Sequence, residues 1–256
     1  MRLRRVPGIL LCAALTAAAG CGGDDSGGGG ERGELTVSAA ASLTEAFESY
    51  AEGTPGEERF SFAGSDELAA QIRQGAAPDV YAAANTELPE MLAEEGLVEQ
   101  PRVFTTNSLV LAVPKDSEIE SIDDLTVPGI DLVIGAEDVP FGSYTLTVLD
   151  RLPAADGEAI LDNVRSEESD VKAAVGKLSQ GAADASFTYV SDVAAASDRL
   201  EAIELPAELQ PDVAYGVAVV KDAQSPEAAR AFVDGLLSGA GTQALEDAGF
   251  KPRSGG

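Results

Sequence analysis

The feature that most constrains the fold is a regular alternation of short β-prone runs with helical patterns from Glu34 onward. The run LTVSA precedes a helical pattern over about 43–51, RFSFAG precedes one over about 67–74, and DVYAAA precedes one over about 87–95. This spacing is typical of βαβ units and predicts a parallel or mixed sheet. At 256 residues, the chain is long enough for a substantial core in one domain or in two modest lobes.

Two similar apolar strands, SLVLAVP and VAYGVAVV, enclose a second α/β set of about a hundred residues. That set contains DLVIGA, a helical pattern over about 144–152, SDVKAAVGKLSQG and ADASFTYV, and two more helical patterns close the chain. We therefore predict one discontinuous lobe, residues 34–110 with 215–253, that encloses a second lobe, residues 111–214. A single larger doubly wound sheet is the alternative, and periodicity alone does not separate the two arrangements.

The N-terminal segment has the pattern of a secretory signal. MRLRR is positively charged, and the apolar run that follows is too short to span a bilayer comfortably. Small residues then lead into Cys21, which is similar to the lipobox of bacterial lipoproteins, except that alanine replaces leucine three positions before the cysteine. We predict a signal peptide over 1–20, lipidation at Cys21, a glycine-rich tether over 21–33 and an extracytoplasmic, lipid-anchored protein. A plain secretory signal is the alternative.

Composition excludes several classes of function. A net charge of −27 argues against nucleic acid and against charge-driven binding to anionic membranes. The chain has no histidine, the commonest general base and metal ligand, and we expect neither a metal cation nor a cofactor. A hydrolase with Ser42 or Ser65 as nucleophile is disfavoured, because the chain has no GxSxG motif and no lysine beside either serine. A surface lipoprotein without a small ligand remains open.

Five predicted helix starts carry small or polar residues. They lie at Ser42, Ser65, VPFGSY, the run Ser169 to Val171, and Tyr189. Each one alone is explained by helix capping. Together they indicate an anion site, because helix N-termini converge beyond the carboxyl ends of strands in open α/β sheets. No lysine or arginine lies inside these loops, and Lys172 is the nearest.

Several longer motifs resemble those of the periplasmic molybdate-binding proteins of ABC importers. These motifs are VSAAASLTEAF, FAGSDELAAQIRQGAAPDVYAAAN, VPFGSYTLTVL, SDVKAAVGKLSQGAADASFTYVSD and ALEDAGFKP, and the resemblance covers essentially the whole chain after the tether. It implies a two-lobed α/β fold of the class II periplasmic-binding-protein type, with a mixed sheet flanked by helices in each lobe and the ligand in the interlobe cleft. It also implies a monomeric binding protein that passes molybdate, and tungstate, to a permease and ATPase.

Carried over by motif, the resemblance assigns five hydrogen-bond donors to the oxyanion. These are the hydroxyls of Ser42, Ser65 and Tyr189 and the backbone amides of Phe141 and Val171. A site made only of donors favours molybdate, tungstate or sulfate over phosphate, which keeps a proton part of the time and rewards an acceptor. A binding protein for another tetrahedral oxyanion, such as sulfate, is therefore the alternative.

Two positions depart from the family's pattern. Phe141 stands where a small residue is usual, so its ring could reshape the mouth of the pocket. Asp66 stands where a neutral residue often follows the second binding serine. A carboxylate suits the first turn of a helix but repels a dianion, so we expect Asp66 to face solvent.

Overall fold

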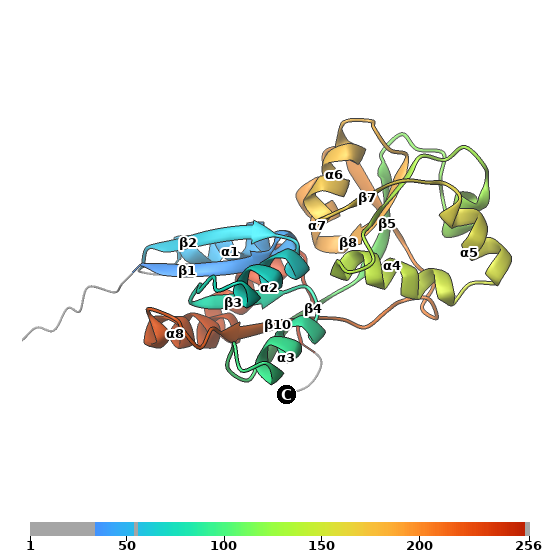
Figure 1. Cartoon of the computed structure of the whole chain (residues 1–256). Helices are drawn as coiled ribbons and strands as arrows, with labels where there is room; N and C mark the ends of the chain where they lie inside the picture. The colour runs from blue at the N-terminus through green and yellow to red at the C-terminus, as the bar shows by residue number, and fades with distance from the viewer. Residues whose placement is uncertain (1–33, 54–55, 254–256) are drawn as a thin grey trace, which may run out of the picture. The chain divides into compact units, whose positions relative to one another are not determined.

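The computed structural model describes residues 34–53 and 56–253, and these residues form two five-stranded sheets flanked by helices (Figure 1). The first sheet has the order β2-β1-β3-β10-β4. Its strands are β1 (Leu35–Ala40), β2 (Glu58–Ala63), β3 (Val80–Ala83), β4 (Arg102–Asn107) and β10 (Val213–Val219). Strand β1 runs parallel to β2 and β3, whereas β10 is antiparallel to β3 and β4.

The second sheet repeats this plan with the order β7-β6-β8-β5-β9. Its strands are β5 (Leu109–Pro114), β6 (Leu132–Gly135), β7 (Val164–Glu168), β8 (Ala185–Tyr189) and β9 (Leu200–Glu204). Strand β6 is parallel to β7 and β8, and β5 is antiparallel to β8 and β9. The prediction of two lobes, each with a mixed sheet, is thus confirmed, and a single larger sheet is excluded.

The chain passes between the sheets twice. The first passage is at Ser108, between β4 and β5, and the second lies within 205–212, between β9 and β10. Sheet membership therefore changes at Leu109 and Val213, each two residues before the lobe boundaries that we placed from the sequence. The lobe ranges themselves, 34–110 with 215–253 and 111–214, stay a prediction.

Nine α-helices and two 3₁₀ turns are present in the described residues. With the first sheet go η1 (Ala41–Leu43), α1 (Thr44–Glu52), α2 (Ser65–Arg73), α3 (Glu87–Glu94), α8 (Pro226–Leu236) and α9 (Gly239–Asp247). With the second go η2 (Ile122–Thr126), α4 (Pro140–Asp150), α5 (Ala154–Leu161), α6 (Val171–Ser179) and α7 (Val190–Ala195). Within 34–53 and 56–253, no helix combines the length and apolar character needed to cross a bilayer.

Three strands, β4, β7 and β9, were not predicted from the sequence. All three lie at the edge of a sheet. The sequences of β7 (VRSEE) and β9 (LEAIE) carry charges, and most of their residues are exposed or half-buried. An edge strand is paired on one side only and tolerates charged residues, so its apolar signal is weak. The central β5 is buried along almost its whole length, which is why its pattern was clear.

Candidate functional site

One pocket receives residues from loops at both sheets. Its volume is about 220 Å³, including the open space at its mouth. All five predicted donors line it, together with the small or apolar residues Ala40, Ala41, Ala63, Gly64, Ala84, Val139 and Pro140, and with Asp170. Residues that are far apart in the sequence therefore meet in one place, at the start of η1, α2, α4, α6 and α7.

Ser42 occupies the middle of the short 3₁₀ turn that joins β1 to α1. The Thr44 hydroxyl donates to the carbonyl of Ala41 at 2.7 Å and closes this turn from the helix side. The Ser42 side chain is buried, and its Oγ lies 3.0 Å from the hydroxyl of Tyr215 on β10. Ser42 therefore does not cap α1 with its side chain. Its hydroxyl is held at the pocket by a tertiary contact instead.

Ser65 is the first residue of α2, and its side chain is buried. Its Oγ accepts a hydrogen bond of 3.1 Å from the backbone N–H of Ala84, and its carbonyl accepts one of 2.7 Å from the Tyr81 hydroxyl. A serine hydroxyl has one hydrogen to donate and two lone pairs. Because a lone pair serves Ala84, the Ser65 hydrogen remains free to point into the pocket.

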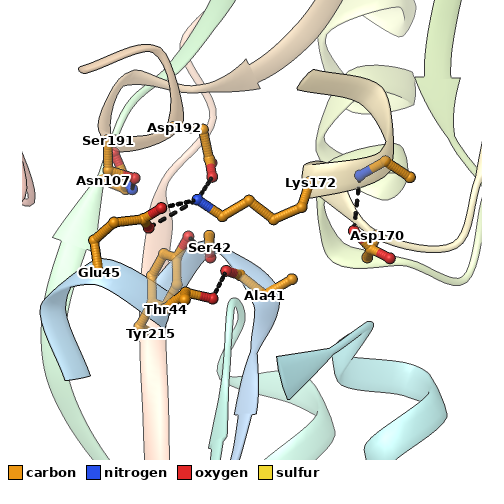
Figure 2. Close-up of polar contacts among 11 residues, drawn as sticks. Ala41, Ser42, Thr44, Glu45, Asn107, Asp170, Lys172, Ser191, Asp192 and Tyr215 are labelled. Carbon is orange, nitrogen blue, oxygen red and sulfur yellow. Dashed lines mark hydrogen bonds and ion pairs between the residues drawn. The ribbon is translucent and has the colours of Figure 1, made fainter. Parts of the chain in front are cut away.

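Two backbone amides come from the N-terminal turns of α4 and α6. Phe141 is the second residue of α4, and Val171 is the first residue of α6. Amides at these positions have no acceptor within their own helix. The N-cap of α6 is Asp170, which accepts from the Ala173 N–H at 2.9 Å (Figure 2). That bond leaves the Val171 amide available, at the positive end of the helix dipole.

Close packing brings the start of α4 to the end of β6. A Cβ atom at Gly142 would lie 2.0 Å from the carbonyl oxygen of Ala136, so only glycine fits there. The ring of Phe141 is buried in the core and packs against Gly135, which also has no room for a side chain. Phe141 therefore contributes to the pocket without widening or blocking it with an exposed ring.

Tyr189 ends β8 and is the N-cap residue of α7. Its hydroxyl is buried and has no hydrogen-bond partner of normal geometry among the described residues. Its ring contacts that of Tyr215 edge to face, with 5.7 Å between the ring centroids. Burial raises the pKa of Tyr189 well above its usual value of 10.0, so the phenol stays neutral and can donate. An unpartnered buried donor in a pocket is suited to a ligand acceptor.

No lysine or arginine lines the pocket. Lys172 follows the lining residue Val171, and its ammonium group lies 2.7 Å from both carboxylate oxygens of Glu45 and 3.5 Å from Oδ1 of Asp192 (Figure 2). Asp192 is completely buried, and burial raises its pKa to about 7, with Lys172 opposing and Glu45 reinforcing the shift. The five predicted donors are thus neutral, Asp170 is the charged residue of the lining, and Lys172 pairs with Glu45 and Asp192 beside the pocket.

The expectation that Asp66 faces solvent was wrong. Its Oδ1 is buried without a hydrogen-bond partner among the described residues, and burial raises its pKa. The reason is local: the first turn of α2 draws the carboxylate toward the backbone N–H groups of Asp66 and Glu67, which oppose the pKa shift. The Asp66 side chain thus lies over the N-terminus of α2, next to Gly64.

Sequence reasoning missed Tyr215 and Glu45 as neighbours of the site. Tyr215 lies inside a long apolar strand, and nothing in VAYGVAVV marks its hydroxyl as a partner of Ser42. Glu45 looks like an ordinary first-turn acid of α1. Asp192 did belong to a recognised motif, but its burial beside Lys172 depends on the tertiary structure.

Comparison with known proteins gives consistent results. Residues 35–251 match the bacterial extracellular solute-binding protein family. The molybdate-binding protein ModA of Mycobacterium tuberculosis is 37% identical over 224 residues, which cover 84% of this chain and 84% of that relative. The solved periplasmic molybdate-binding protein of Azotobacter vinelandii superposes with a TM-score of 0.75 at 19% identity, over 84% of this chain and 98% of that one.

The sulfate-binding protein SubI of Mycobacterium tuberculosis superposes equally well. Its TM-score is 0.75 at 17% identity, over 86% of this chain and 87% of that one. At such identities the two solved structures establish the two-lobed fold and do not distinguish between ligands.

Proposed function

Because the chain belongs to the family of bacterial extracellular solute-binding proteins, we propose that it captures molybdate and delivers it to an ABC importer. Members of this family act outside the cytoplasm, and they bind substrates for transport and do not convert them. The ModA proteins of Mycobacterium tuberculosis and Escherichia coli, 37% and 30% identical to this chain, support molybdate as the ligand. Tungstate has the same charge and shape as molybdate, and we expect it to bind as well.

The observation that carries the proposal is one pocket where the five predicted donors meet and where no lysine or arginine is present. Ser42, Ser65 and Tyr189 would donate through their hydroxyls, and Phe141 and Val171 through their backbone amides. Molybdate is a dianion near neutral pH and has no hydrogen to donate, so it needs donors at every oxygen. A buried anion without a counter-ion is tolerated only when its oxygens are hydrogen-bonded.

Lobe closure would convert binding of the anion into a signal for the importer. With the lobes taken as 34–110 plus 215–253 and 111–214, Ser42 and Ser65 belong to one lobe and the other three donors to the second. Contacts already join these segments outside the pocket. Lys172 pairs with Glu45, and the side-chain amide of Asn107 donates to the Ser191 hydroxyl at 2.9 Å. A ligand held by both lobes stabilises the closed arrangement.

The serines are unsuited to nucleophilic catalysis. The side-chain contact of Ser42 is with Tyr215, and that of Ser65 is with the backbone amide of Ala84. Neither partner is a general base, and the chain has no histidine that could approach. Within 34–53 and 56–253, no group of acidic or cysteine side chains could hold a catalytic metal ion.

Isothermal titration with molybdate, tungstate, sulfate and phosphate tests the proposed ligand. We expect molybdate and tungstate to bind much more tightly than sulfate, and phosphate to bind most weakly. Sulfate binding tighter than molybdate would make this a sulfate-binding protein. A chain that gives neither heat nor a thermal shift with any oxyanion would instead be a surface lipoprotein without a small ligand; a hundredfold excess of ligand over its Kd should add about 2.7 kcal/mol of stability.

We also propose that Cys21 carries the lipid anchor, after removal of residues 1–20, and that 21–33 tether the binding lobes to the membrane. These residues lie outside those that the structure describes. The anchored protein would act as a monomer with its permease and ATPase. Labelling with a radioactive fatty acid should mark the wild-type protein and leave Cys21→Ser unlabelled and released to the medium. Equal labelling of both proteins would exclude this anchor.

A further inference from the structure

Tyr215 lies directly behind the first ligand serine. It is on β10, its side chain is completely buried, and its hydroxyl is 3.0 Å from Oγ of Ser42. It does not line the pocket. We propose that Tyr215 is a positioning residue, which receives a hydrogen bond from Asn107 and donates to Ser42, so that the Ser42 hydrogen is left for the anion. This inference rests on the proposed function.

The direction of the hydrogen-bond chain is set at Asn107, the last residue of β4. The backbone N–H of Ser108 donates to Oδ1 of Asn107 at 2.8 Å. A backbone N–H can only donate, so the atom facing it must be the amide oxygen. The amide nitrogen therefore points the other way, where one hydrogen reaches Oγ of Ser191 at 2.9 Å. The second hydrogen of this nitrogen is available to the nearby Tyr215 hydroxyl. Burial raises the pKa of Tyr215, and the Asn107 side chain acts to lower it, as a donor to the phenol oxygen does.

An amide nitrogen supplies two hydrogens and accepts none. The hydroxyl of Tyr215 is therefore the acceptor in its contact with Asn107, and its own hydrogen is directed to another partner. The 3.0 Å contact with Ser42 allows either hydroxyl to donate, and we assign the hydrogen to Tyr215, so that Ser42 accepts. Burial raises the pKa of Tyr215 well above 10.0, which keeps this hydrogen in place at physiological pH.

The consequence concerns the single hydrogen of Ser42. If Tyr215 were an acceptor here, Ser42 would donate its hydrogen to the tyrosine and present only lone pairs to the ligand. Lone pairs repel an oxyanion. With Tyr215 as the donor, a lone pair of Ser42 is occupied and its hydrogen can face the pocket. The same pattern holds at Ser65, whose Oγ accepts from the Ala84 amide.

The ring of Tyr215 is fixed independently of its hydroxyl. It packs edge to face against Phe104, Tyr189 and Phe250, with centroid distances of 6.2, 5.7 and 5.3 Å. Replacement of Tyr215 by phenylalanine keeps these ring contacts and removes only the hydroxyl. The variant Tyr215→Phe is therefore expected to fold, and near-ultraviolet circular dichroism and thermal unfolding would verify this.

A double-mutant cycle tests the positioning role. The full-length protein and the variants Ser42→Ala, Tyr215→Phe and the double variant are titrated calorimetrically with molybdate. We expect Tyr215→Phe to weaken binding about tenfold, or about 1.4 kcal/mol, because Ser42 loses the bond that directs its hydrogen. In the Ser42→Ala background the same change should alter the Kd by less than about twofold, since the hydroxyl to be directed is gone. A purely structural role would weaken both backgrounds equally.

Tyr50→Phe is the matched control, because Tyr50 is also a buried tyrosine beside the first sheet, with its ring against Phe232. It should leave the Kd unchanged. Equal losses in the two backgrounds, or no loss from Tyr215→Phe alone, would overturn the positioning role while leaving the proposed function intact. A wild-type protein that binds no oxyanion would overturn the proposed function and this inference with it.

Discussion

The ammonium group of Lys172 donates to both carboxylate oxygens of Glu45 at 2.7 Å, although Lys172 is on α6, beside the second sheet, and Glu45 is on α1, beside the first (Figure 2). Oδ1 of Asp192 on α7 lies 3.5 Å from the same ammonium group. One cation thus connects a half-exposed carboxylate of one lobe with a completely buried carboxylate of the other. The contacts of Lys172 therefore bear on lobe closure, on the protonation of Asp192 and on the stability of the site.

We predict that Lys172→Met speeds the release of molybdate. The ion pair with Glu45 closes one side of the site, but both partners are partly exposed, and screening limits its value to about 1 kcal/mol or less. The dissociation rate measured by stopped-flow should rise by up to about fivefold. Lys177→Met is the control, since Lys177 is on the same helix but pairs with Glu168 of the same lobe. Equal effects of the two substitutions would argue against a specific interlobe contact.

We predict that the change that Asp192→Asn makes in the free energy of unfolding is more favourable above pH 7 than at pH 4. Burial raises the pKa of Asp192 in the folded state to about 7, from its ordinary 3.8. The folded state therefore binds a proton that the unfolded state has lost, and stability falls as the pH rises from about 4 to about 7. The full cost of ionisation is roughly 3–5 kcal/mol. Urea unfolding at pH 4 and pH 8 measures the difference, and the same change at both pH values would contradict the prediction.

The same carboxyl group should make anion affinity depend on pH. A bound dianion raises the pKa of Asp192 further, so binding takes up a proton and the Kd increases as the pH rises above about 7. Histidine, which ordinarily titrates in this range, is absent from the chain. Titrations from pH 6 to pH 9 should show this dependence in the wild type and a flat profile in Asp192→Asn. A variant with the wild-type slope would assign the proton to another group.

We predict that Gly64→Ala weakens anion binding at least tenfold without unfolding either lobe. A Cβ atom at Gly64 would lie 2.3 Å from the carbonyl oxygen of Ser169, which belongs to the enclosed segment, so the two lobes could not approach as they do. The backbone of Gly64 has a φ of −58°, which alanine adopts without strain.

The control for that change is Gly176→Ala, where the nearest atom to a new Cβ is 3.9 Å away and where alanine favours the helix. Its Kd should match that of the wild type. Small-angle scattering with saturating molybdate should show a larger radius of gyration for Gly64→Ala than for the control. Identical scattering and affinity would show that closure tolerates a methyl group at Gly64.

We predict that Asp66→Ser tightens molybdate binding. Asp66 follows the proposed ligand residue Ser65, and its carboxylate is partly buried, with Oδ1 lacking a partner among the described residues. Removing a negative charge near a dianion should contribute about 1 kcal/mol, or about fivefold in Kd. Glu67→Gln serves as the control, because Glu67 is in the same turn but is exposed and bonds Gln71. An unchanged Kd for Asp66→Ser would place its charge out of range of the ligand.

Much of this arrangement could be predicted locally. The order of strands and helices follows from runs such as the one around Leu109, because a central strand is buried on both faces and has an almost continuous apolar sequence. The helix starts at Ser65 and Val171 follow from capping residues and small residues just before them. Edge strands such as β7 were not predicted, because a strand that is paired on one side only tolerates charged residues and has a weak apolar pattern.

The sequence by itself determined the kinds of groups available: serines and a tyrosine at helix starts, free amides, no histidine, and no lysine or arginine within those loops. Only the tertiary structure decided which groups meet. It placed Tyr215 behind Ser42, brought Lys172 to Glu45, and buried Asp192 beside Lys172. The physical reason is that capping and burial periodicity act over a few neighbouring residues, whereas side-chain partners and pKa values depend on packing between segments that are distant in the sequence, as Ser42 and Tyr215 are.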